Sequence, residues 1–235
     1  RFDRDTAPDV PATTQTADAA DDRAERREER EGMVASQIQD RGVDDPAVLA
    51  AMRAVQRHRF VPDGFADQAY RDHPLPIGYG QTISQPYIVA YTVQAMRLGA
   101  GDRVLEVGTG SGYAAAVLAE LCAEVVTIEC ISSLAESAGE RLARLGYGNV
   151  TVIEGDGGMG RPSDAPFDAI AVAAAGPSIP DALVDQLSAG GRLVMPVGRR
   201  RGGQHLVRAV RTAGGTEVEA LLPVTFVPLT GAAAQ

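Results

Sequence analysis

Short apolar runs recur through the second half of the chain, and segments with helical spacing separate them. The runs predicted to be strands are 104–107, 125–128, 150–153, 167–173 and 193–197, and the helices predicted between them are 114–121, 134–145 and 179–187. This alternation favours a doubly wound, mostly parallel sheet with helices on its faces. Two further runs, 205–211 and 217–226, flank Gly214-Gly215 and predict an antiparallel strand pair at the C-terminal end.

The first hundred residues follow a different pattern, in which apolar positions at helical spacing are interrupted by glycine and proline. Gly42 and the Asp45-Pro46 pair separate two short helices, because glycine commonly ends a helix and Asp-Pro commonly begins one. Pro86 begins a third helix that runs through Met96, with Ser84 or Gln85 placed to cap it. We therefore expect an N-terminal helical cap over about residues 32–100, within a single domain spanning 32–235.

Residues 1–31 are rich in Asp, Ala, Thr, Arg and Glu and nearly free of large apolar side chains. Such a segment buries too little apolar surface to offset its ordering entropy, so it is predicted to be a disordered tail. Its last part, 23–31, is placed to extend the first cap helix as a charged, solvated stretch.

Composition narrows the classes of partner. The formal net charge of −9 argues against nucleic acid, which requires a basic face, and no apolar run approaches a membrane span in length. Two cysteines and three scattered histidines form neither a disulfide framework nor a metal-ligand pattern. We expect a cytoplasmic monomer without metal; export is the alternative if a signal peptide preceded Arg1.

A glycine-rich turn follows the first predicted strand of the sheet. Its spacing is Gly-x-Gly-x-Gly from Gly108 to Gly112, and Tyr113 stands where a dinucleotide fingerprint has its third glycine. Glu106, two residues before the first glycine, would repel a pyrophosphate but suits the sulfonium and ammonium of S-adenosylmethionine. The motif therefore resembles the first motif of class I methyltransferases, with a dinucleotide site and a ligand-free turn as alternatives.

Two further features lie where this fold places ligands. Glu129 ends the next predicted strand about twenty residues after the glycines, where a ribose-binding acid is expected. Residues 70–87 contain three prolines and several polar side chains, which predicts a structured loop, and long irregular segments in compact domains are often functional.

Four motifs together resemble one methyltransferase family. The stretch Pro76-Ile-Gly-Tyr-Gly-Gln-Thr-Ile-Ser-Gln-Pro86 precedes Leu105-Glu-Val-Gly-Thr-Gly-Ser-Gly-Tyr113, and Pro166-Phe-Asp-Ala-Ile170 and Phe226-Val-Pro-Leu-Thr230 follow. Over about residues 33–231 the chain resembles the protein-L-isoaspartate O-methyltransferases. The resemblance implies a Rossmann-like class I methyltransferase that methylates the α-carboxylate of L-isoaspartyl residues in damaged proteins or peptides, after which the ester collapses to a succinimide.

The resemblance also implies the roles of individual residues. Ser84 matches the family's active-site serine, and Thr230 matches its threonine near the end of the last strand. The residues implied to bind S-adenosylmethionine are Gln81, Thr82, Ile83 and Ser84 beside the methyl donor, Gly108, Thr109 and Gly110 at the methionine, Glu129 and Cys130 at the ribose, Asp156 and Gly157 at the adenine, and Thr230. Two stretches depart from the family pattern: 158–162 lacks aromatic side chains, and 173–176 lacks a threonine.

The expected chemistry requires positioning more than acid–base catalysis. An isoaspartyl carboxylate is already ionised at neutral pH, so it needs no general base. A hydroxyl at a helix start can fix one of its oxygens, which is the role expected of Ser84; it lacks the Gly-x-Ser-x-Gly context of a nucleophile. The alternatives are a related enzyme that esterifies one aspartate of a peptide substrate to form aspartimide, a nucleotide-dependent oxidoreductase, and a non-catalytic binding protein.

Overall fold

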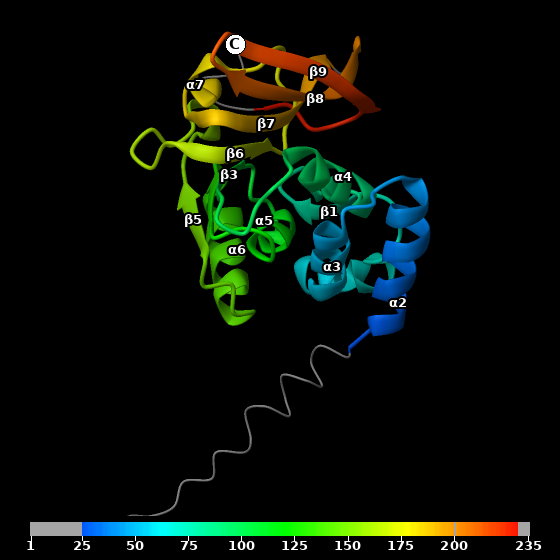
Figure 1. The fold of residues 1–235 in the computed structure, drawn as a ribbon. Helices are drawn as coiled ribbons and strands as arrows, with labels where there is room; N and C mark the ends of the chain where they lie inside the picture. The colour runs from blue at the N-terminus through cyan, green and yellow to red at the C-terminus, as the bar shows by residue number, and fades with distance from the viewer. Residues whose placement is uncertain (1–24, 200, 230–235) are drawn as a thin grey trace, which may run out of the picture.

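The computed structural model describes residues 25–199 and 201–229, and seven strands of this part form one twisted sheet (Figure 1). The strands are β3 (Arg103–Val107), β4 (Glu124–Glu129), β5 (Val150–Glu154), β6 (Phe167–Val172), β7 (Leu187–Arg199), β8 (Gly203–Thr212) and β9 (Gly215–Val224). Their order is β5-β4-β3-β6-β7-β8-β9. Neighbours from β5 to β7 run parallel and β7, β8 and β9 run antiparallel, which confirms the predicted fold class and the antiparallel C-terminal pair.

The helices that cross between the parallel strands are α5 (Tyr113–Ala119), α6 (Ser132–Arg144) and α7 (Asp181–Val184), with the short helical turn η5 (Gly157–Met159) after β5. The helix predicted over 179–187 is wrong in length, because only α7 is helical there. Leu187 instead begins β7 and pairs with Phe167 of β6, and both side chains are buried. Pairing along two neighbouring strands therefore takes precedence over the local helical pattern.

The N-terminal cap is built from short elements. They are α2 (Arg27–Gly32), η1 (Met33–Ile38), η2 (Gln39–Arg41), α3 (Pro46–Ala54), η3 (Arg57–Phe60), η4 (Asp63–Gln68), the hairpin of β1 (Leu75–Gly78) and β2 (Gln81–Ile83), and α4 (Pro86–Met96). Asp45 caps α3, since its Oδ1 accepts from the N–H groups of Ala47 at 2.8 Å and Val48 at 3.3 Å. Gly42, with φ of 91°, ends the preceding turn as predicted.

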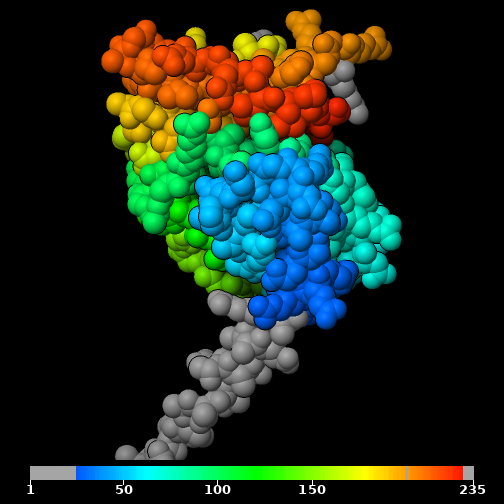
Figure 2. Space-filling view, turned by 45° about the vertical axis from the view of Figure 1, so that its right-hand side comes forward, coloured from blue at the N-terminus to red at the C-terminus, as the bar shows by residue number. Residues whose placement is uncertain are grey.

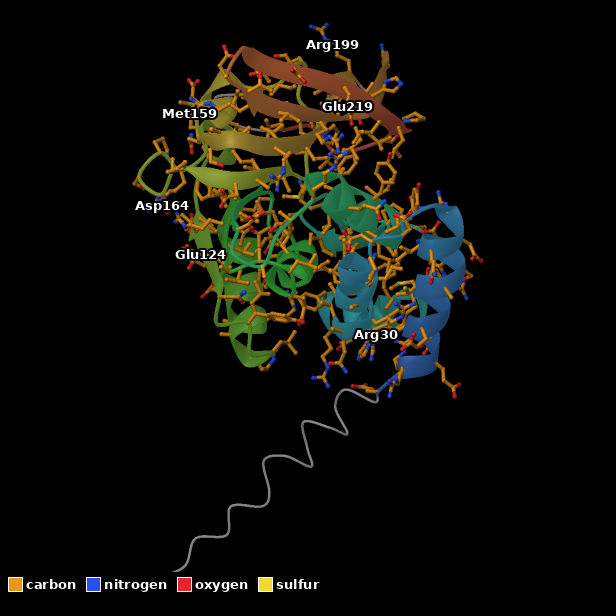
Figure 3. All side chains as sticks on the ribbon, in the orientation of Figure 1. Arg30, Glu124, Met159, Asp164, Arg199 and Glu219 are labelled. Carbon is orange, nitrogen blue, oxygen red and sulfur yellow. The ribbon has the colours of Figure 1, made fainter. Side chains whose placement is uncertain are left out.

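Helix α2 lies at the end of the predicted tail, where residues 23–31 are expected to extend the first cap helix, and it packs on the folded cap. Arg30, labelled in Figure 3, is only 4% exposed, and its Nε donates to the carbonyl oxygen of Arg53 at 2.5 Å. Arg26 donates to the carbonyl oxygen of Ala66 at 2.7 Å. Both arginines donate hydrogen bonds to backbone carbonyl oxygens of other cap segments, and the amino-acid composition of the tail does not predict these contacts. Residues 1–24 of the predicted tail lie outside the described residues.

One apolar core joins the cap to the sheet. Its buried side chains include Met33 of η1, Met52 of α3, Val104 of β3 and Tyr113 of α5, so the cap packs directly against the β3–α5 unit. Figure 2 shows the cap, in blue to cyan, below the orange and red C-terminal strands. Within the described residues, no helix combines the length and apolar character needed to cross a bilayer.

Candidate active site

A cavity of about 230 Å³ lies where the β1–β2 hairpin meets the carboxyl ends of β3 and β4. Among its lining residues are ten of the twelve predicted donor-binding residues: Gln81, Thr82, Ile83, Ser84, Gly108, Thr109, Gly110, Glu129, Cys130 and Gly157. The structure therefore brings together the proline-rich loop and the glycine turn, which are separated in sequence by α4 and β3.

Glycine is required at two places in the wall of this cavity. Gly110 has φ of 54°, and a Cβ there would lie 3.2 Å from Cδ1 of Ile77 in the hairpin. A Cβ on Gly157 would lie 2.4 Å from Cγ1 of Val107, closer than real contacts allow. Because these positions lack a side chain, η5 and the hairpin can lie close to the end of β3 and form the walls of the cavity.

Glu129 is fixed at the end of β4 by backbone donors. Its Oε2 accepts from the N–H of Gly110 at 2.8 Å, and its Oε1 accepts from the N–H of Ile131 at 3.0 Å. The side chain is 5% exposed and lines the cavity. A carboxylate oxygen can accept more than one hydrogen bond, so Glu129 retains acceptor capacity for hydroxyl groups of a bound ligand.

Glu106 is a cavity residue that the predicted donor-binding set does not contain. Its pKa is raised to about 8, chiefly by burial; the hydrogen bond from Thr127 opposes this shift and the nearby Glu129 adds to it. The Thr127 hydroxyl donates to Oε2 of Glu106 at 2.6 Å and lies 2.6 Å from the Thr109 hydroxyl. Burial therefore favours the protonated form of the Glu106 carboxyl at neutral pH. The sequence predicts a charged carboxylate here that repels a pyrophosphate; because Glu106 is completely buried, the structure favours its neutral form instead.

The charge of the cavity discriminates between the candidate ligands. Two acidic side chains, Glu106 and Glu129, line it, and no arginine, lysine or histidine does so in the part of the chain that the structure describes. A pyrophosphate would meet no cationic partner here, whereas bound phosphates are normally held by cations and free N–H groups. The sulfonium and ammonium of S-adenosylmethionine are cations and fit a lining that has acidic side chains and no basic ones. The dinucleotide alternative is therefore disfavoured.

Ser84 lies between β2 and α4 and is half-buried against the cavity. Gln85 occupies the N-cap position of α4, but no side chain caps the helix, so the predicted capping role of either residue is wrong. No hydrogen-bond partner is found for the Ser84 hydroxyl among residues 25–199 and 201–229. Its hydroxyl is therefore available to a bound molecule. A second, apolar cavity of about 40 Å³ adjoins the first at Ser84 and Glu106.

Two predicted residues are not among those that line the cavity. Asp156 precedes η5, and its Oδ1 accepts from the N–H of Gly158 at 2.9 Å. Its role at the adenine stays a prediction. Thr230 lies outside the described residues. Met159, labelled in Figure 3, is 50% exposed and lies in the stretch that lacks the expected aromatic side chains.

Part of the cavity wall was not predicted from the sequence. Ala173 and Ala174, which follow β6, line it together with Val227, Pro228 and Leu229. Ala175 fixes this second segment, since it donates to Val227 and accepts from Leu229 through backbone bonds of 2.8 and 2.9 Å. The C-terminal motif Phe226-Val-Pro-Leu-Thr230 was the sequence feature that could have indicated this part of the wall.

Among the described residues, no group of three or more potential ligands is arranged to hold a metal ion.

Comparison with known proteins places these features in a family. The family model described as protein-L-isoaspartate (D-aspartate) O-methyltransferase matches residues 28–234. Protein-L-isoaspartate O-methyltransferase 1 of Rhodopseudomonas palustris (strain HaA2) is 57% identical over 213 residues, covering 90% of this chain and 87% of the relative.

Solved structures agree with this result. One protein-L-isoaspartate O-methyltransferase superposes with a TM-score of 0.79 at 27% identity, covering 88% of this chain and 67% of the other. A second protein with this description, from Plasmodium falciparum and in complex with S-adenosyl-L-homocysteine, superposes with a TM-score of 0.74 at 26% identity, covering 86% and 98%.

Proposed function

This chain belongs to the protein-L-isoaspartate (D-aspartate) O-methyltransferase family, and we propose that it transfers a methyl group from S-adenosylmethionine to the α-carboxylate of L-isoaspartyl residues in damaged proteins or peptides. The ester initiates repair by collapsing to a succinimide. The observation that carries this proposal is a cavity that joins a donor site without cationic side chains to the hydroxyl of Ser84, which has no hydrogen-bond partner among the described residues.

Ser84 orients the acceptor. An isoaspartyl carboxylate is ionised at neutral pH and is itself the nucleophile, so no proton has to be removed from it. The Ser84 hydroxyl donates a hydrogen bond to one carboxylate oxygen, which limits rotation and directs the other oxygen towards the donor site. Ile83 and Val89, which line the same cavity, exclude water from the reacting groups.

The remaining lining residues hold the donor, which supplies the methyl group from its sulfonium. Glu129 accepts hydrogen bonds from the ribose hydroxyls, with Cys130 beside it, and Gly108, Thr109 and Gly110 surround the methionine portion. Gln81, Thr82 and Ile83 border the methyl group from the hairpin side. Asp156 and Gly157 at the adenine, together with Thr230, complete the proposed set. The relative solved with S-adenosyl-L-homocysteine supports the choice of donor.

Paired peptides test the proposed reaction. Two peptides of one sequence, containing L-isoaspartate or L-aspartate at one position, are incubated with the enzyme and methyl-labelled S-adenosylmethionine. Label should enter only the isoaspartyl peptide as a base-labile ester, and the product should convert partly to the aspartyl peptide. Selective labelling of the aspartyl peptide would instead indicate the aspartimide-forming alternative.

The proposal also includes the oligomeric state and the compartment. We propose a monomer because the donor and acceptor portions of the cavity come from one chain. Cys122 and Cys130 are not joined in a disulfide, which is compatible with a reducing cytoplasm. Light scattering after gel filtration should give the mass of one 24.6 kDa chain, and a dimer mass would contradict the proposal.

A further inference from the structure

The loop that carries Ser84 is tied to the N-terminal cap through one carboxylate. Oδ2 of Asp72 accepts from Nε2 of Gln85 at 2.7 Å and from Nη1 of Arg41 at 2.5 Å. We call this set of three residues, Arg41, Asp72 and Gln85, the Asp72 bridge. It joins the end of η2, the turn before β1 and the start of α4, which are far apart in sequence.

The Asp72 bridge adjoins Ser84 without lining the cavity. Ser84 has a fixed residue on each side: Ile83 is buried and pairs with Leu75 across the hairpin, and Gln85 is bound to Asp72. No side-chain cap at the start of α4 fixes this turn. The contact between Gln85 and Asp72 is therefore the side-chain hydrogen bond that restrains the loop on the C-terminal side of Ser84.

A further contact connects the Asp72 bridge to α4. The Arg41 guanidinium carbon lies 3.6 Å from the centre of the Tyr87 ring on α4, so Arg41 contacts both Asp72 and the helix that follows Ser84. Oδ1 of Asp72 is buried and has no hydrogen-bond partner among the residues that the structure describes. The hydrogen bonds that Asp72 accepts therefore converge on Oδ2, where the two donors meet.

We propose that Asp72 is a positioning residue for methyl transfer, which acts through Gln85 to fix the Ser84 hydroxyl relative to the donor site. This inference rests on the acceptor-orienting role of Ser84 proposed above. A displaced hydroxyl would still bind the carboxylate, but the attacking oxygen would be poorly aligned, and small misplacements of reacting groups reduce rates strongly. The Asp72 bridge should therefore affect turnover and not the affinity for the donor.

Variants of the Asp72 bridge provide the test. Asp72→Ala and Gln85→Ala should each lower kcat on the isoaspartyl peptide on the order of 10- to 100-fold, with an unchanged Kd for S-adenosylmethionine. Asp72→Asn retains an acceptor oxygen and should keep more activity than Asp72→Ala. Glu31→Gln is the matched control, because Glu31 forms a cap ion pair with Arg53 at 2.9 Å that does not involve the loop; its kcat should equal that of the wild type.

A double variant separates positioning from general stability. If Asp72 acts through Ser84, adding Asp72→Ala to Ser84→Ala should lower kcat little further, whereas independent effects would multiply. Multiplying effects, or wild-type kcat in Asp72→Ala, would overturn the inference. If Asp72→Ala does not fold, Gln85→Ala removes the same hydrogen bond from the loop side and decides the outcome. Wild-type activity in Ser84→Ala would contradict the proposed role of Ser84 itself, which distinguishes that failure from a failure of Asp72 alone.

Discussion

The two sides of the active-site cavity are built in different ways. On the donor side, the glycine turn and Glu129 belong to consecutive elements of one strand–helix–strand unit. The N–H of Gly110 donates to the carboxylate of Glu129, which lies only 19 residues later in the sequence. On the acceptor side, Ser84 depends on the hairpin and on Arg41 and Asp72 from the cap. The donor side is thus determined by a compact motif, and the acceptor side by tertiary contacts. Variants of the two sides should accordingly separate binding from turnover.

Ser84→Ala should give the largest effect and the clearest separation. Loss of one positioned hydrogen-bond donor costs roughly 3–4 kcal/mol of barrier, or about 10²–10³-fold in kcat. Donor affinity should change little, and helix α4 should persist because Ser84 does not cap it. Steady-state kinetics and calorimetry with S-adenosylmethionine measure the two quantities.

Ser84→Thr sharpens this test, because a hydroxyl remains but its methyl group crowds the donor site. It should retain part of the activity lost in Ser84→Ala. A methylated or acylated Ser84 trapped during turnover and detected by mass spectrometry would show that the serine is a covalent participant, in contradiction to the orienting role.

Glu106 should give the donor side a characteristic pH dependence. Its pKa is about 8 in the folded chain against 4.5 for an ordinary glutamate. Between these values the folded state binds more protons than the unfolded state, so the free energy of unfolding should fall as pH rises from about 4.5 to about 8. The slope from this group is at most about 1.4 kcal/mol per pH unit.

The isosteric change Glu106→Gln should remove this contribution. Urea unfolding of the ligand-free wild type and variant, measured at intervals between pH 5 and pH 8.5, should therefore give stability curves that diverge, with the variant gaining relative to the wild type as pH rises. Parallel curves would mean that Glu106 is already ionised in the folded protein.

Sequence reasoning succeeded where structure is local. Short motifs that specify their own backbone conformation predicted three features correctly. These are the strand–glycine turn–helix unit, the position of Glu129 at the end of β4 and the Asp45 cap. Sequence reasoning failed where distant contacts decide. Part of the helix predicted over residues 179–187 is replaced by strand pairing. Arg30 is buried because it donates to backbone carbonyls of other segments. The burial of Glu106 depends on side chains from several elements.

Glu129→Ala should weaken donor binding without a comparable loss of turnover at saturation. The ribose hydroxyls and the N–H groups of Gly110 and Ile131 would lose their acceptor, which costs about 1–3 kcal/mol for buried unpaired donors. Calorimetric titration should detect the corresponding rise in Kd. An unchanged Kd with a reduced kcat would contradict the expectation that the donor side determines binding and the acceptor side determines turnover.

Truncation of the N-terminus should give the smallest effect and locate where the cap begins. Removal of residues 1–24 should leave the thermal midpoint and kcat unchanged, because that segment has few side chains that burial could stabilise. Removal of residues 1–31 also deletes buried Arg30 and the ion pair of Glu25 with Arg59 at 3.0 Å, so stability should fall on the order of 1 kcal/mol. The activity of the longer truncation, compared at a temperature where both variants are folded, tests whether the cap acts on turnover through the acceptor side alone. Equal midpoints for the two truncations would show that α2 contributes nothing to the cap, whereas weaker donor binding in the longer one would show that the cap also supports the donor side.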